Sequence, residues 1–252
     1  MNTSDRPVPP PLEVFHYPAD FEVSVIRKFD GSSIHLWLAC VNDAEQGQRA
    51  FLDCLGEDER VRARGLRHEL ARREFVLGRG LLRSLLAGAI HCLPSEIDFR
   101  YTAAGKPVLA AAAQCGIIQF SVSHSGGHVA IALARRRRVG VDIELMDARM
   151  NWMELAHRIF SNREIASIQG LPAAQRREAF FQRWTCKEAL LKATGSGLID
   201  DLSAIEFDLA EGRPPTLLRA PAEAGEPGRW TFHRPPVPDR MAGSLAVEEW
   251  TE

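Results

Sequence analysis

The chain has 252 residues, of which 45% are hydrophobic and 25% are charged, a composition ordinary for a globular protein with a substantial core. The formal net charge of −2 argues against a general nucleic-acid binder, and no apolar run approaches the roughly 20 residues that span a bilayer. Five scattered cysteines indicate neither a disulfide framework nor a zinc site, and the polar N-terminus lacks a signal-peptide layout. We therefore expect a soluble, cytoplasmic protein without a membrane partner.

The first half of the chain predicts one strand, a long helical region and a group of strands. Residues 1–20 are expected to be a disordered lead-in, because the prolines at 9 to 11 prevent a helix. Ser33–Val41 predicts a strand, and leucines at three-and-four spacing over 56–88 predict helix that internal glycines could divide. Further strands are expected at Ile117–Val122, Val129–Ala134 and Val139–Leu145.

The second half continues with two helices and a proline-rich end. Ser161 and Glu164 form an S-x-x-E capping box, and a longer helix is expected from about Gln175 to Thr194. A short strand near Ser244–Glu249 closes the chain. Because helix-then-strands occurs twice, we predict an α+β fold of two similar halves, 21–125 and 126–252, with a ligand cleft between them.

Two acidic residues lie where a strand core is expected. In the strand Val139–Leu145, Asp142 and Glu144 point to one face while the valines and isoleucine point to the other. Two carboxylates that close repel each other unless a cation lies between them, and Mg²⁺ prefers such oxygen ligands. The alternative is a strand with one solvated face, and the D-x-E pattern alone does not decide between them.

A third carboxylate, Glu188, lies on the apolar side of the last long helix. At about 100° per residue it projects near Phe181 and Trp184, and Lys192 lies one turn later on the same side. A bare carboxylate buried there costs several kcal/mol unless it is paired or metal-bound. The alternative is an exposed Glu–Lys pair at i, i+4, which explains the spacing but not the aromatic neighbours.

Candidate phosphate-binding groups precede the acidic strand. Ser123 and His124 stand at a strand end before Gly126-Gly127, and such hydroxyl, imidazole and accessible amide groups suit a phosphate. A purely structural histidine remains an alternative. Residues 60–83 carry eight arginines against two acids, a concentration that favours a polyanionic ligand or, alternatively, a solvated helix face. Lys106, between Gly105 and Pro107, is a further candidate on a constrained loop.

Three segments occur in one order: Ser123-His124-Ser125-Gly126, then Gly140-Val141-Asp142-Ile143-Glu144, then Trp184-Thr185-Cys186-Lys187-Glu188 followed by Lys192. This order resembles the 4′-phosphopantetheinyl transferase superfamily, particularly its larger, surfactin-synthetase-activating type. The G-K-P loop at 105–107 and the glycines at 195 and 197 extend the resemblance, which covers roughly residues 35 to 210.

The resemblance implies a fold, a reaction and a set of site residues. It implies a pseudo-twofold pair of α+β halves in a monomer, with coenzyme A and Mg²⁺ between them. By position it implies metal binding by Asp142, Glu144 and Glu188. For coenzyme A it implies contacts from Arg62, Lys106, Ser123, His124 and Lys192, together with Tyr101 and Gly105 at the nucleotide end. Arg73 is a further coenzyme A candidate. Relatives often carry a basic residue at the position of Glu59, so this chain departs from the pattern there.

The implied reaction is transfer of phosphopantetheine from coenzyme A to a serine of an apo acyl or peptidyl carrier protein, with release of 3′,5′-ADP. Glu188 is the expected general base, because an apolar setting raises a carboxyl pKa, and Lys192 is expected to stabilise the leaving phosphate. A metal-dependent phosphohydrolase and an arginine-rich nucleic-acid-binding module are the alternatives. The nucleic-acid module would leave the three carboxylates without a purpose.

Overall fold

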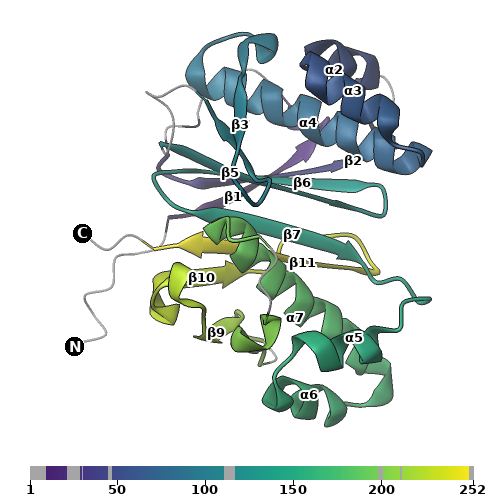
Figure 1. Ribbon diagram of the computed structural model, residues 1–252, viewed down its shortest axis with the longest axis vertical. Coiled ribbons are helices and arrows are strands. Elements are labelled where there is room, and N and C mark those ends of the chain that lie inside the picture. Colours follow the sequence, from purple (N-terminus) through teal and green to yellow (C-terminus); the bar gives the residue numbers. More distant parts are fainter. Residues whose placement is uncertain are drawn as a thin grey trace.

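The computed structural model describes residues 10–21, 29, 31–44, 47–110, 117–197, 201–210 and 212–249. Its main elements form four layers, in which two β-sheets lie between two long helices (Figure 1). Helix α4 (Glu69–Ile90) covers the first sheet, and helix α7 (Ala173–Thr194) covers the second. The predicted α+β class is therefore confirmed.

The first sheet has the order β1-β2-β6-β5. Its strands are β1 (Leu12–Tyr17), β2 (Ile34–Cys40), β6 (His128–Arg135) and β5 (Ile118–Ser125). Strand β1 runs parallel to β2, and the other neighbours are antiparallel. The predicted boundary between residues 125 and 126 lies in the turn of the β5–β6 hairpin, whose two strands belong to this one sheet.

The second sheet is antiparallel, with the order β10-β11-β7. Its strands are β10 (Trp230–His233), β11 (Met241–Glu248) and β7 (Val139–Leu145). Two small hairpins complete the strands, β3 (Phe99–Tyr101) with β4 (Pro107–Leu109) and β8 (Glu206–Asp208) with β9 (Thr216–Arg219).

The shorter helices flank the two long ones. They are α2 (Gln48–Cys54), α3 (Glu57–Gly65), α5 (Trp152–Ile159) and α6 (Asn162–Gln169), with 3₁₀ turns at Pro94–Glu96, Leu202–Ala204, Ala222–Ala224 and Pro227–Arg229. The capping box predicted at Ser161 is confirmed, because its side chain accepts from the amide of Glu164 and that carboxylate caps Ser161 in return. Among the described residues, no helix is long and apolar enough to cross a membrane.

Alternation along the strands explains the layers. In β6, Val129, Ile131 and Leu133 pack under α4, while the alanines between them face the second sheet. In β7 the apolar residues Val139, Val141 and Ile143 face the first sheet. Gly140, Asp142 and Glu144 therefore face α7, so the strand directs its two acids toward the second long helix.

Gly140 allows α7 to lie directly on β7. A Cβ atom at this position would be 2.0 Å from the carbonyl oxygen of Ala189 and 2.5 Å from the amide nitrogen of Ala193. Backbone atoms cannot give way at such distances, so only glycine fits here. The glycine thus sets how closely the helix that carries Glu188 approaches the strand that carries Asp142.

Serine hydroxyls join the two sheets along β5 and β7. Ser121, Ser123 and Ser125 accept hydrogen bonds from the amides of residues 141, 143 and 145 at 3.0, 3.2 and 3.0 Å. Two of these hydroxyls also donate to carboxylates, Ser123 to Asp142 Oδ1 at 2.9 Å and Ser125 to Glu144 Oε2 at 2.8 Å. Each of these two serines therefore fixes both the backbone and an acid of β7.

One sequence prediction needs correction, and a second is confirmed in part. Residues 12–17 of the predicted disordered lead-in form β1, because prolines prevent a helix but tolerate an edge strand, and Leu12 and Val14 pack against the apolar cluster between the sheets. Residues 1–9 lie outside the described part of the chain. The helical region 56–88 is two helices that separate after Gly65, whereas Gly78 and Gly80 are buried within α4. Gly80 lies there because a Cβ would be 2.3 Å from Phe51 of α2.

Candidate active site

A cavity of about 320 Å³ opens between α4 and the C-terminal end of α7. Its walls come from α3, α4, β5, the loop between β3 and β4, and the C-terminal part of α7 with the turn that follows it. Among the residues predicted to form a site, Arg62, Gly105, Lys106, His124, Glu188 and Lys192 line it. This volume lies within the range of pockets that bind cofactors and small substrates.

The three predicted acids lie near one another at the edge of this cavity. Asp142 is buried at the centre of β7, and Glu144 lies two residues along the same face. Glu188 approaches from α7 and lines the cavity. The negative charge of Asp142 raises the pKa values of both Glu144 and Glu188, and the charge of Glu144 raises the pKa of Glu188.

Burial and mutual repulsion raise the pKa values of two of these acids. Burial first, and then the charges of Asp142 and Glu144, raise the pKa of Glu188 to about 7, against a smaller opposing effect of Lys192. Burial and the charge of Asp142 also raise the pKa of Glu144, while hydrogen bonds from Ser125 and Trp184 lower it in part. Close carboxylates with raised pKa values are typical of sites that bind a cation or move a proton.

Lys192 neutralises part of this negative charge. Its Nζ lies 2.6 Å from Asp142 Oδ1 and donates to Ser123 Oγ at 2.9 Å. The side chain is 31% exposed and lines the cavity, so the ammonium can reach a ligand there. The predicted phosphate-binding lysine is therefore placed between the acids and the cavity. Ser123, predicted to contact coenzyme A, donates its hydroxyl to Asp142 Oδ1.

The three acids offer carboxylate oxygens, the ligands that a hard divalent cation prefers. Asp142 Oδ2 is buried and has no hydrogen-bond partner, which is costly for a carboxylate oxygen and suits a cation ligand. Within the described ranges, however, no set of three or more His, Cys, Asp or Glu side chains is arranged to hold a metal ion. The Lys192 ammonium, 2.6 Å from Asp142 Oδ1, compensates part of the negative charge of Asp142.

The predicted nucleotide contacts divide into two groups. Arg62 lines the cavity with its guanidinium 5.2 Å from the centre of the Phe75 ring. Gly105 also lines it and has a φ of +81°, a conformation that favours glycine. Arg73 and Tyr101 are not among the lining residues: Arg73 donates to the carbonyl of Val41 at 2.9 Å, and Tyr101 is 44% exposed on β3.

Lys106 connects the two walls of the cavity. Its Nζ donates to the carbonyl oxygens of Lys192 at 2.6 Å and Ala193 at 3.3 Å, in the last turn of α7. A cation suits this end of a helix, where carbonyls lack partners. Burial, with a smaller effect of Arg138, lowers the pKa of Lys106 to about 8. In this structure the lysine caps a helix, at a position where it also faces the predicted coenzyme A site.

Sequence reasoning missed several lining residues on α4. Glu74, Phe75 and Arg79 face the cavity, and Arg79 pairs through Nε with Glu59 Oε1 at 3.2 Å. Arg83 binds the other oxygen of Glu59 at 2.7 Å, so the acid that replaces a basic residue in this family pattern holds two arginines. The sequence pattern that could have revealed them is a charged residue within the apolar stripe of a helix. The same pattern identified Glu188.

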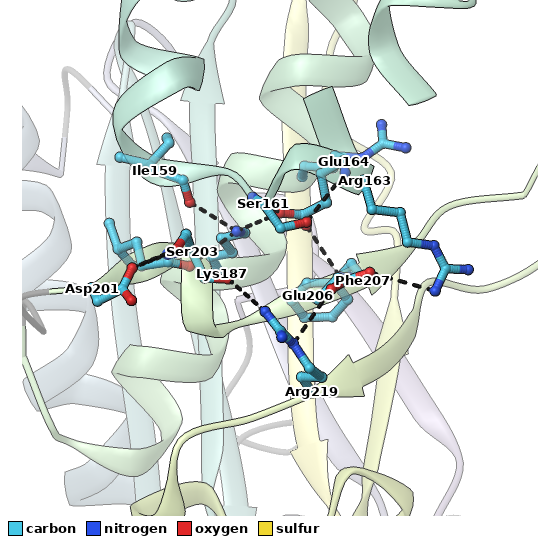
Figure 2. Close-up of polar contacts among 12 residues, drawn as sticks. Ile159, Ser161, Arg163, Glu164, Lys187, Asp201, Ser203, Glu206, Phe207 and Arg219 are labelled. Carbon is cyan, nitrogen blue, oxygen red and sulfur yellow. Dashed lines mark hydrogen bonds and ion pairs between the residues drawn. The ribbon is translucent and has the colours of Figure 1, made fainter. Parts of the chain in front are cut away.

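The lysine of the W-x-x-K-E segment is structural. Lys187 is 1% exposed, and its Nζ donates to Glu164 Oε2 at 2.7 Å and to the carbonyls of Ile159 at 2.9 Å and Leu202 at 3.0 Å (Figure 2). Glu164 in turn accepts from the amide of Phe207 at 3.1 Å. Every donor of Lys187 is satisfied, so this residue holds α5, α6 and the β8 region on α7 and has no group left for a ligand.

Two family models match successive parts of the chain. The model described as 4′-phosphopantetheinyl transferase superfamily matches residues 138–240, and one described as 4′-phosphopantetheinyl transferase, N-terminal, matches residues 42–136. The first match includes β7, α7 and β10, and the second includes α4, β5 and β6. An N-terminal half of this kind fits the larger, surfactin-synthetase-activating type.

Curated relatives extend over most of the chain. The 4′-phosphopantetheinyl transferase HetI of Nostoc sp. is 37% identical over 75% of this chain and 79% of its own length. A phosphopantetheinyl transferase of Thraustochytrium sp. is 29% identical over 79% of this chain and 73% of its own length. A solved holo-[acyl-carrier-protein] synthase of Thermotoga maritima is 29% identical, with a TM-score of 0.36 over 45% of this chain and 63% of its own. The chain therefore belongs to the 4′-phosphopantetheinyl transferase superfamily and is an enzyme of that class.

Proposed function

We propose that this enzyme binds coenzyme A in the cavity between its halves and transfers the phosphopantetheine arm to a serine of an apo acyl or peptidyl carrier protein. The observation that carries this proposal is the meeting of Asp142, Glu188 and Lys192 at one edge of the cavity. Cationic or donor groups, Arg62, Lys106 and His124, lie around the rest of it. A polyanionic, nucleotide-containing substrate matches this distribution of charge.

The acids are the proposed magnesium ligands. Asp142, Glu144 and Glu188 would hold Mg²⁺, which supplies charge neutralisation for the pyrophosphate when it is bound. Support comes from the partnerless Asp142 Oδ2 and from the raised pKa values of Glu144 and Glu188. Ser123 and Ser125 orient two of these acids through their hydroxyls. Such outer contacts commonly fix the geometry of metal-binding carboxylates.

Glu188 is the proposed base. The serine oxygen of the carrier forms a bond to the β-phosphorus of coenzyme A, and the proton of that hydroxyl passes to Glu188. The bond from the same phosphorus to the leaving oxygen breaks, and 3′,5′-ADP leaves with its electron pair. A carboxyl whose pKa is about 7 is partly ionised at neutral pH and also holds the proton it receives.

Lys192 is proposed to stabilise the leaving phosphate. Its ammonium lies at the cavity wall, beside the acids. A charge that is already positioned where negative charge develops lowers the barrier without reorganisation. Lys106 would add a second charge on the opposite wall if its contact with the end of α7 shifts toward the substrate. The enzyme is predicted to act as a cytoplasmic monomer.

Intact mass of the acceptor tests the proposal. The purified protein is incubated with coenzyme A, Mg²⁺ and a panel of apo carrier proteins from fatty-acid, polyketide and nonribosomal-peptide systems. We expect at least one carrier to gain the mass of a phosphopantetheine, and a carrier with alanine at its acceptor serine to gain none. Release of phosphate from coenzyme A without any modified carrier would instead indicate a phosphohydrolase, and the proposal would be wrong.

A further inference from the structure

Glu74 joins α4 to the turn between β5 and β6, at the wall of the cavity. Its side chain is buried, with 8% exposed, although it comes from a helix face that also carries Phe75 and Gly78 into the cavity. Oε1 accepts from the backbone amide of Gly127 at 2.6 Å, and Oε2 lies 3.2 Å from His124 Nδ1. Both carboxylate oxygens are thus used, one on the backbone of the turn and one on the imidazole.

The contacts of Glu74 favour an ionised carboxylate. Burial alone would raise the pKa of Glu74, but the hydrogen bonds from His124 and from the amide of Gly127 outweigh it and hold the pKa below its usual value. An ionised carboxylate can only accept hydrogen bonds, so Nδ1 of His124 must carry a hydrogen. The tautomer of His124 is therefore set by a residue fifty positions earlier in the chain.

This arrangement also fixes the direction of the ring. With Nδ1 facing Glu74, Nε2 lies on the other side of the imidazole, and the side chain is 48% exposed and lines the cavity. A free histidine side chain can rotate and exchange its two tautomers, whereas this one is held in one orientation. The turn beneath the ring is held as well, because the amide of Gly127 donates to Glu74. Gly126 and Gly127 form this turn with φ of +58° and +84°.

We propose that Glu74 is a positioning residue, which orients His124 and the 125–128 turn so that Nε2 meets a phosphate group of the substrate. This inference rests on the proposed function for its ligand, coenzyme A. Toward a phosphate oxygen, Nε2 must donate, and the ring is then an imidazolium whose charge is balanced by the carboxylate of Glu74. Carboxylates orient metal-binding and catalytic histidines in the same way, by accepting a hydrogen bond from one ring nitrogen.

Glu74→Gln tests the pairing with almost no change in volume. Glutamine offers only one acceptor oxygen, so if it keeps the contact with Gly127 it turns its amide donor toward Nδ1 of His124. The neutral glutamine no longer balances an imidazolium, so the hydrogen bond from Nε2 to the phosphate loses its charge assistance. We therefore expect the KM for coenzyme A to rise about tenfold, while kcat changes by less than about threefold. Glu69→Gln, on the exposed first turn of the same helix, is the matched control and should leave both constants unchanged.

The tautomer is read directly by long-range ¹H–¹⁵N correlation spectra of protein labelled at histidine. In the wild type we expect the His124 ring to carry its hydrogen on Nδ1, and in Glu74→Gln to carry it on Nε2. His124→Ala assigns the signal. The wild-type spectrum alone tests the inference if the Glu74→Gln protein does not fold, because an Nε2–H tautomer in the wild type would overturn it.

The outcomes separate this inference from the proposed function. An unchanged KM in Glu74→Gln, in a wild type that modifies carriers, overturns the positioning role and leaves the transferase intact. A wild type that modifies no carrier overturns the proposed function, and the spectra still decide whether Glu74 sets the tautomer. A fall in kcat without a change in KM would also overturn the inference, since it would place Glu74 in the chemical step rather than in binding.

Discussion

Helix α7 carries two lysine–carboxylate pairs that differ in how completely they are enclosed. In the pair of Lys187 and Glu164 both side chains are 1% exposed, and backbone groups satisfy the remaining polar atoms. In the pair of Lys192 and Asp142 the lysine is 31% exposed, and Asp142 Oδ2 has no partner. The closed pair can only hold elements together, whereas the open pair has bonding capacity left for a ligand.

The comparison teaches how to separate structural from functional charges in one helix. Both lysines belong to the same sequence motif, and each lies next to or one turn from Glu188. Burial alone does not distinguish their partners, because Asp142 and Glu164 are both buried. What distinguishes them is the number of unsatisfied atoms and the neighbouring cavity. The predictions below test that distinction, beginning with the largest expected effect.

Glu188→Gln, a change beside the open pair of Lys192 and Asp142, should abolish most of the enzyme's activity. We expect the rate of carrier modification to fall about 10³-fold, because the variant loses both the base and one cation ligand. Initial rates measured by intact mass of the carrier provide the test. Glu178→Gln, an exposed acid on the same helix, should keep the wild-type rate. A Glu188→Gln enzyme with near-normal turnover would remove Glu188 from the mechanism.

Lys187→Met should lower the stability of the fold, because Lys187 has a structural and not a catalytic role. Removing this lysine leaves Glu164 buried without its counter-charge, so the free energy of unfolding should fall by about 3–5 kcal/mol. Lys192→Met should cost less, about 1–2 kcal/mol, because the lysine is 31% exposed and Asp142 keeps the hydrogen bond from Ser123. Urea unfolding followed by circular dichroism measures both values. If the two variants were equally unstable, the distinction between closed and open pairs would be wrong.

The stability of the metal-free protein should depend on the protonation of Glu188. Its folded pKa of about 7 lies above the ordinary glutamate value, so the folded state binds the proton more tightly than the unfolded state. Stability contributed by this proton is present at low pH and is lost as pH rises from about 4.5 to 7. Relative to the wild type, Glu188→Gln should therefore gain about 1–3 kcal/mol between pH 5 and pH 8 in EDTA, after allowance for solvent screening.

Thermal unfolding of both proteins across this pH range measures that gain. The difference between variant and wild type should be smallest below about pH 3.5, where the wild-type carboxyl is protonated in both states. A difference that stays constant with pH would show that Glu188 is not the titrating group.

Ser125→Ala should produce the smallest effect. It removes the hydrogen bonds to Glu144 and to the amide of Leu145, so we expect a loss of about 1 kcal/mol in stability and a rate decrease of a few fold. It should also raise the pKa of Glu144 further, since the Ser125 hydroxyl lowers it. Ser121→Ala, which removes a similar amide contact to β7, is the comparison for the stability loss. Equal pKa values for Glu144 in both variants would contradict the role of Ser125.

The sequence predicted the carboxylates well because strand and helix periodicity are local. Asp142 and Glu144 share a face because side chains alternate along a strand. Glu188 lies on the apolar side of its helix when successive residues are placed about 100° apart around the axis. The strand Val139–Leu145 and the end of the long helix at Thr194 were predicted at the bounds that the structure has. The roles of these residues in metal binding and catalysis remain predictions.

Pairings between distant segments could not be predicted. Lys187 and Glu164 are 23 residues apart, and Glu74 and His124 are 50 apart, so no helix or strand period relates them. Arg73 illustrates the same limit, because its place in an arginine-rich segment did not reveal that it binds the carbonyl of Val41. Lys106 looked like a free loop cation, and only the folded arrangement brings it to the end of α7.

Gly140 never touches a substrate, yet it controls the spacing between the two parts of the acidic site. Any side chain there would act as a wedge between β7 and α7, since even a methyl group would overlap the helix backbone at Ala189. The wedge would move Glu188 away from Asp142 without altering either residue. Losses of activity from substitution at position 140 should thus mimic loss of an acid, and the first glycine of G-V-D-I-E is best understood as a spacer.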